Sequence, residues 1–258
     1  MQISVVVPVY NSQYILPKLV KNIHSELNKK IINFEIILVN DYSEDKSWTI
    51  IKKLSKKHHC IRGINLKKNF GQHNALMAGF TECRGNFIIT MDDDLQHSPK
   101  DIIRIYNILL SNSDVCYVRY INRKHSSIKI FFSHLNHIIS SFLLNKSQNI
   151  YSSSFRGFKK KIMKKLIKYK KNNVYVDALI FNSTRNISII PVNHYPRMKG
   201  VGNYNFFKLF FLWCNMVENF PVKPIRFASF VGIFLKFLLI FLIKKKTNEQ
   251  FIIKSKTY

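Results

Sequence analysis

Short apolar runs alternate with segments of mixed polarity along most of the chain. Six runs of about four to eight residues are rich in Val, Ile, Leu and aromatic side chains, as buried β-strands are. The strands predicted from these runs are Ile3–Tyr10, Phe34–Asp41, Ile61–Leu66, Phe87–Met91, Val115–Tyr120 and Ile187–His194. Apolar residues at spacings of three and four predict helices over Tyr14–Leu27, Lys46–Lys57, Gln72–Cys83 and Pro99–Leu110.

This alternation predicts an α/β fold with a mainly parallel sheet covered by helices on both faces. The chain has 258 residues, enough for one such domain and a short appendage. Ligands of such sheets bind beyond the carboxyl ends of the strands. The polar residues at the predicted strand ends are Tyr10 and Asn11, Asn40 and Asp41, Asn69, and Asp92–Asp94.

Three consecutive carboxylates, Asp92, Asp93 and Asp94, close the fourth predicted strand. Their mutual repulsion favours a bound cation, and oxygen ligands at alternate positions suit Mg²⁺ or Mn²⁺. Such an ion takes further ligands from a diphosphate and stabilises charge on a departing nucleoside diphosphate. The alternative is helix capping, because acidic residues before Ser98 and Pro99 also complement the dipole of the next helix.

Two other strand ends carry candidate binding residues. Asp41 can accept hydrogen bonds from a base or ribose, or serve as a turn residue. Gly71 lies between a predicted strand and a helix, where backbone amides can approach a phosphate, although tight turns also use glycine. Lys67, Lys68 and His73 add basic groups nearby.

The charge balance favours anionic partners. The chain has 41 Lys and Arg against 14 Asp and Glu, a formal net charge of +27. Charge alone does not distinguish nucleic acid, lipid headgroups and nucleotides. One interpretation of this charge is a nucleic-acid-binding protein. No basic-aromatic binding module supports that interpretation, so we do not expect nucleic acid as a partner.

The last fifth of the chain differs from the rest. An aromatic-rich segment precedes Phe227–Ile243, an apolar run interrupted by Ser229, Gly232 and Lys236. That run is about 25 Å long as a helix, slightly short for a bilayer core, which favours an interfacial or re-entrant helix and association with a second copy. We divide the chain into a catalytic domain (1–205), an amphipathic juxtamembrane segment (206–226), a hydrophobic membrane-associated segment (227–243) and a basic tail (244–258). The amino terminus lacks the pattern of a signal peptide, so we expect the protein at the cytoplasmic face of the membrane.

Six motifs together resemble glycosyltransferase family 2, and within it the polyprenyl-phosphate and dolichyl-phosphate sugar transferases. They span nearly all of residues 3–228. The motifs are PVYN (8–11), VNDYSEDKSW (39–48), NFGQHNALMAGF (69–80), MDDDLQHSP (91–99), SSFRGFKKKI (153–162) and HYPRMKGVGNYNFFKL (194–209). Family members often carry Glu where this chain has Ser12, and this branch commonly has two membrane spans where this chain has one apolar segment.

The resemblance implies the GT-A fold and transfer of a sugar from a nucleoside diphosphate. It assigns metal binding to Asp92 and Asp94, with Gln96 beside the diphosphate and Asp93 in the variable middle place. The implied donor-nucleotide residues are Pro8, Tyr10, Asn11, Asp41, Asn69, Gly71, Asp92 and Asp93. The implied phosphate- and acceptor-binding residues are Arg119, Arg123, Arg156 and Arg197.

Two acceptors are consistent with these residues. A polyprenyl phosphate is already ionised near neutral pH, so its attack needs positioning and charge neutralisation more than a base, and arginine suits that task. The catalytic residues are then Asp94, Gln96 and Arg197. A sugar hydroxyl of a surface polysaccharide needs a carboxylate base, for which Asp177 is the best placed candidate. Its alternative role is that of a buried or capping residue.

Overall fold

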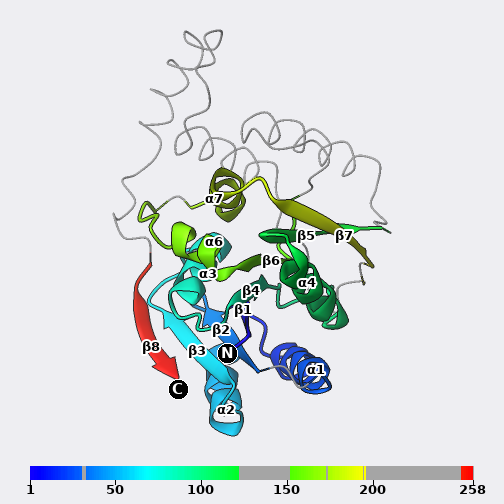
Figure 1. Ribbon diagram of the computed structural model, residues 1–258. Coiled ribbons are helices and arrows are strands. Elements are labelled where there is room, and N and C mark those ends of the chain that lie inside the picture. Colours follow the sequence, from blue (N-terminus) through cyan, green and yellow to red (C-terminus); the bar gives the residue numbers. More distant parts are fainter. Residues whose placement is uncertain (31–32, 122–151, 173, 194, 196–250, 258) are drawn as a thin grey trace, which may run out of the picture.

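The strands of the protein form one sheet. The computed structural model describes residues 1–30, 33–121, 152–172, 174–193, 195 and 251–257 (Figure 1). Within them, eight strands lie in the order β7-β5-β6-β4-β1-β2-β3-β8. The strands are β1 (Ile3–Val9), β2 (Phe34–Asn40), β3 (Ile61–Leu66), β4 (Phe87–Thr90), β5 (Val115–Tyr120), β6 (Arg156–Lys159), β7 (Ile187–Val192) and β8 (Ile253–Thr257).

The sheet is mainly parallel, as the sequence predicts. Strand β1 pairs in parallel with β2 and β4, β2 with β3, and β5 with β7. The two strands that the sequence did not predict, β6 and β8, are the antiparallel ones: β6 lies between β4 and β5, and β8 pairs with β3 at the edge. The carboxyl ends of β4, β1, β2 and β3 therefore lie side by side in that order.

Helices cover both faces of the sheet, which confirms the predicted layers (Figure 1). Residues of α1 (Leu16–Asn28), α2 (Ser47–Lys57) and α4 (Lys100–Ser111) share one apolar core. Residues of α3 (Gln72–Thr81), α6 (Lys160–Leu166) and α7 (Val176–Ser183) share the other. Alternate strand residues serve the two cores, so Val5 and Val7 face one and Val6 faces the other.

The pattern of buried side chains explains which helices could be predicted. Helix α1 buries Leu16, Leu19, Val20, Ile23 and Leu27, the three-and-four spacing that predicted it. It begins at Leu16 with Pro17 in its first turn, where the missing amide has no intrahelical acceptor. Helices α6 and α7 span seven and eight residues and were not predicted, because so few turns give little periodic signal.

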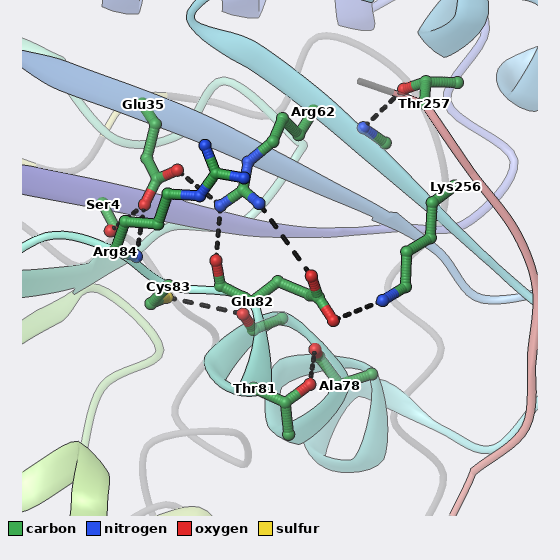
Figure 2. A network of polar contacts seen from close by, with 12 residues as sticks. Ser4, Glu35, Arg62, Ala78, Thr81, Glu82, Cys83, Arg84, Lys256 and Thr257 are labelled. Carbon is green, nitrogen blue, oxygen red and sulfur yellow. Dashed lines mark hydrogen bonds and ion pairs between the residues drawn. The ribbon is translucent and has the colours of Figure 1, made fainter.

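A buried polar network joins the amino ends of three strands (Figure 2). Glu35 of β2 accepts hydrogen bonds from the Ser4 hydroxyl of β1 at 2.5 Å and from the Arg62 guanidinium of β3 at 2.5 Å. Arg62 also donates to the Glu82 carbonyl. Glu35 and Arg62 are 1% and 8% exposed. Each charge has a partner, so this network holds the strands in register and lies at the opposite end of the sheet from the predicted ligand side.

The tail returns to the sheet as β8. Lys256 pairs with Glu82 at 2.5 Å, and the Gly63 amide donates to the Thr257 hydroxyl oxygen at 2.7 Å (Figure 2). The predicted segments 206–226 and 227–243 lie outside the described residues, as does 244–250. No helix in the described part of the chain is long and apolar enough to cross a membrane.

Candidate active site

Unusual backbone angles gather at the carboxyl ends of four neighbouring strands. Within the described ranges, positive φ occurs at Asn11 (53°), Tyr42 (60°), Leu95 (60°) and Gly71 (87°). These residues belong to the loops that follow β1, β2, β4 and β3 respectively. A side chain at positive φ costs about 1 kcal/mol or more, and such residues cluster where a site needs a fixed loop shape.

The middle carboxylate of the acidic run faces the end of β1. Oδ2 of Asp93 accepts hydrogen bonds from the Ser12 hydroxyl at 2.5 Å and the Tyr10 amide at 3.2 Å. Burial raises the pKa of Asp93 to about 6; the hydrogen bonds from Ser12 and Tyr10 oppose this rise, and Asp92 and Asp94 add to it. Asp93 therefore fastens the β4 loop to the β1 loop.

The outer two carboxylates have different partners. Asp92 accepts hydrogen bonds from the Gln72 amide group at 2.7 Å and the Ser154 hydroxyl at 2.5 Å. Asp94 is 7% exposed and accepts a hydrogen bond from the Gln96 amide at 3.0 Å.

Asp41 organises the turn between β3 and α3. Its two carboxylate oxygens accept hydrogen bonds from the amides of Phe70 at 2.8 Å and Gly71 at 2.9 Å. Burial raises the pKa of Asp41, and these two bonds oppose the rise. The Gly71 amide, a candidate phosphate donor by sequence, is therefore bonded to Asp41 in this structure.

Hydrogen bonds fasten the β1 loop to the β2 loop. The Asn11 amide donates to the Ser43 hydroxyl oxygen at 3.0 Å, and the Glu44 amide donates to the Asn11 side-chain carbonyl at 2.9 Å. The Ser12 amide donates to the Ser47 hydroxyl oxygen at 2.9 Å. The four loops thus form one connected rim.

The rim continues past β4 to β5 and to the chain after β7. Backbone and side chain of Gln96 contact the backbone of Tyr195 at 3.1 and 3.3 Å. The His97 ring stacks on Tyr120 and Phe155, and its Nε2 lies 2.7 Å from the Tyr120 hydroxyl. These contacts place Tyr195, the described residue of the HYPR motif, beside the acidic run.

Arg156 and Asp177 form an ion pair inside the protein. They are 1% and 5% exposed, and Asp177 also accepts a hydrogen bond from the Tyr117 hydroxyl at 2.6 Å. The sequence left open whether Asp177 is a base or a buried residue, and the structure places it in the interior. It also places Arg156 there, where its charge is neutralised by Asp177.

The remaining predicted residues are spread along the rim or lie outside the described part. Pro8 is buried in β1, Asn69 is exposed after β3, and Arg119 is exposed near the end of β5. Arg123 and Arg197 lie outside the described residues, so their places stay predictions.

Sequence reasoning missed three residues that hold the carboxylates: Ser12, Gln72 and Ser154. Gln72 and Ser154 stand inside motifs that marked the site, NFGQ and SSFR, but their spacing from Asp92 gave no sign of contact. Ser12 stood out as a departure from the family pattern, and the structure shows that its hydroxyl binds Asp93.

The acidic run fits a divalent cation shared with a ligand. Asp92 and Asp94 flank Asp93, which is bonded to the β1 loop, and an ionised carboxylate has several acceptor sites that can be shared between protein donors and a cation. Among the described residues, no group of three His, Cys, Asp or Glu side chains is arranged to hold a metal. Two carboxylates with ligand phosphates completing the shell is a common arrangement for Mg²⁺.

Comparison with known proteins agrees with this geometry. The profile of Glycosyl transferase family 2 matches residues 4–167. The undecaprenyl-phosphate 4-deoxy-4-formamido-L-arabinose transferase of Photorhabdus laumondii is 31% identical over 232 residues, which cover 90% of this chain and 71% of that protein. The protein of the same name from Serratia proteamaculans is 29% identical with the same coverage.

Solved structures share the fold. Glucosyl-3-phosphoglycerate synthase of Mycobacterium tuberculosis, in complex with Mn²⁺, UDP-glucose and phosphoglyceric acid, has a TM-score of 0.63 at 16% identity and covers 84% of this chain and 77% of that one. TarS 1-349 of S. aureus with UDP-GlcNAc has a TM-score of 0.56 at 20% identity, covering 92% and 73%. With its motifs, its rim of strand ends and the family profile in agreement, the chain belongs to glycosyltransferase family 2 and is a glycosyltransferase of GT-A fold, similar to the polyprenyl-phosphate sugar transferases.

Proposed function

We propose that the protein transfers a sugar from a nucleoside-diphosphate sugar to a polyprenyl phosphate at the cytoplasmic face of the membrane. The observation that carries this proposal is the connected rim, in which Asp92 and Asp94 stand beside the loops of Tyr10 and Asp41. Relatives named for transfer to undecaprenyl phosphate support the lipid acceptor.

On the donor side, Tyr10 and Asp41 lie at adjacent strand ends and would contact the nucleoside. Asp92 and Asp94 would hold Mg²⁺ or Mn²⁺ together with the diphosphate. The metal neutralises charge on the leaving nucleoside diphosphate when it is bound. A protein of the same fold was crystallised with Mn²⁺ and UDP-glucose, which supports a divalent metal in this site.

Burial of Asp177 favours a phosphate acceptor over a sugar hydroxyl. A hydroxyl needs a base within hydrogen-bond reach, but the Asp177 carboxylate is bonded to Arg156 and Tyr117 in the interior. A phosphate oxygen is already ionised and needs only to be positioned against the anomeric carbon. The proposed mechanism therefore uses no side chain of the described rim as a base.

The acceptor phosphate needs exposed cations. Arg119 is exposed near the end of β5, and the proposal retains Arg123 and Arg197 as its other candidates. Because Arg156 is buried and paired with Asp177, we propose that it positions α7 rather than touching a phosphate.

Strand β8 limits how the protein can meet a membrane. The described residues that precede and follow 196–250 both belong to this domain, at Tyr195 and at β8. If the chain between them contacts the membrane, it must therefore start and end on the side of the membrane where the domain lies. This supports attachment from one face.

The test is lipid-linked product formation with undecaprenyl phosphate, Mn²⁺ and a panel of nucleotide sugars. We expect product with the intact protein, and a loss of at least a hundredfold in Asp94→Asn, which keeps the shape of the side chain but not its charge. Asp101→Asn is the matched control, because Asp101 is as buried but pairs with Arg104 on α4. Sugar transfer to a hydroxyl acceptor alone would contradict the proposal.

A further inference from the structure

Tyr42 is the one rim residue whose strained backbone has no structural explanation in the described part of the chain. Of the other residues at positive φ, Gly71 has no side chain to strain and Asn11 is of a type that adopts this region readily. Leu95 is bulky, but its side chain packs against the apolar core. Tyr42 is 50% exposed, with no hydrogen bond, ion pair or ring contact to another described residue.

The residues on both sides of Tyr42 hold its backbone in this conformation. Asp41 is fixed by its carboxylate bonds to Phe70 and Gly71, and its amide donates to the Val9 carbonyl at 2.9 Å. Ser43 accepts the hydrogen bond from the Asn11 amide at 3.0 Å. Because both neighbours are anchored, Tyr42 cannot relax to negative φ without breaking these bonds, and its side chain stays half exposed.

A second exposed tyrosine lies on the neighbouring strand end. Val9 of β1 pairs with Asn40 of β2; Tyr10 comes one residue after Val9, and Tyr42 comes two residues after Asn40. Tyr10 is 44% exposed. Asp41 directly precedes Tyr42, and the family resemblance implies that Asp41 contacts the nucleoside.

We propose that Tyr42 binds the donor nucleobase by stacking on it, and that its strained backbone is retained because it presents the ring to the base. This proposal deepens the proposed function, since it requires a nucleotide donor. A planar base has an apolar face that an exposed aromatic ring can cover, and such stacking does not depend on a particular hydrogen-bonding edge. Tyr42 therefore contributes affinity for the nucleoside, while the choice of base falls to polar groups such as Asp41.

The proposal makes stability and binding respond in opposite directions. Tyr42→Gly and Tyr42→Asn both suit positive φ, so either variant should unfold at the same temperature as the intact protein or a few degrees above it. Both remove the ring, so both should weaken binding of uridine diphosphate with Mn²⁺ roughly tenfold in titration calorimetry. A variant that only damages the fold would lose stability and binding together.

Two comparisons locate the contact. Tyr42→Phe keeps the ring and should therefore retain most of the affinity that Tyr42→Asn loses. If Tyr42 instead contacted the nucleotide through its hydroxyl, Tyr42→Phe would bind as weakly as Tyr42→Asn. Removal of the Tyr42 ring should weaken the binding of uridine monophosphate and of uridine diphosphate by the same factor, because both nucleotides carry the same base. A loss confined to the diphosphate would place Tyr42 at the phosphates and overturn the proposal.

The two proposals fail in different ways. The binding panel includes the diphosphates of adenosine, guanosine, cytidine and thymidine, so that a different preferred base is found. If the intact protein binds one of them and Tyr42→Gly and Tyr42→Asn bind it equally well, stacking is wrong and the proposed function stands. If the intact protein binds none of them, both proposals are wrong.

Discussion

Arg156 of β6 and Asp177 of α7 form an ion pair whose two side chains are almost completely buried. The Tyr117 hydroxyl of β5 bonds to the same carboxylate oxygen at 2.6 Å. Two candidate site residues, one implied by the family resemblance and one a possible base, are thus linked to each other in the interior.

This pair predicts a large effect on stability. Asp177→Ala leaves the Arg156 charge buried without its partner, so we expect a loss of roughly 3–5 kcal/mol in the free energy of unfolding by urea. Replacing both residues, as in Arg156→Met with Asp177→Leu, should lose less than Asp177→Ala alone. A stable Asp177→Ala protein that lacks only transferase activity would instead support Asp177 as a base.

The contact between Ser12 and Asp93 predicts a smaller effect. Ser12→Ala leaves the Asp93 carboxylate with the Tyr10 amide as its hydrogen-bond donor, so we expect a loss of about 1–2 kcal/mol in unfolding free energy. Ser55→Ala is the control, because Ser55 is also buried but bonds only within α2, to Lys52 at 3.1 Å. Equal losses in the two variants would mean that the tie between the β4 and β1 loops contributes nothing specific.

His73 predicts a pH dependence. Burial lowers the pKa of His73 from 6.5 to about 4; Asp177 opposes this shift and Arg156 adds to it. Between these values the unfolded chain binds a proton that the folded protein does not, so stability is lost as the pH falls below 6.5. From pH 7 to pH 5, the intact protein should lose about 2 kcal/mol more unfolding free energy than His73→Phe, which cannot be protonated. Parallel losses in the two proteins would show that His73 titrates normally.

Strand β8 predicts where the end of the chain lies. Residues 253–257 pair with β3, so a green fluorescent protein fused after residue 258 should lie on the same side of the membrane as one fused before Met1. We expect both of these fusions to fluoresce in cells. In a matching pair of fusions to alkaline phosphatase, we expect the phosphatase to be inactive at both ends of the chain. Phosphatase activity at the carboxyl end alone would mean that β8 is not paired in the membrane-bound protein.

The sequence by itself determined the layered fold and the side of the sheet that carries the candidate site. Both follow from local patterns: apolar periods mark strands and helices, and consecutive parallel strands bring their carboxyl ends to one edge. Asp41 and Asp92–Asp94 could be placed at that edge for this reason. The strands β6 and β8 could not be predicted, because four residues and a lysine-containing tail carry no period, and their pairing depends on partners elsewhere in the sheet.

Tertiary structure alone decided which way each polar side chain is turned. Asp93 bonds to Ser12, 81 positions away in sequence, and Arg156 pairs with Asp177 across 21 positions, inside the protein. No local pattern distinguishes an acid that faces a ligand from one that faces a buried partner, because burial and pairing depend on residues brought together only by folding. The strain at Tyr42 has the same origin, since hydrogen bonds on either side of it fix a loop that its own residue type does not favour.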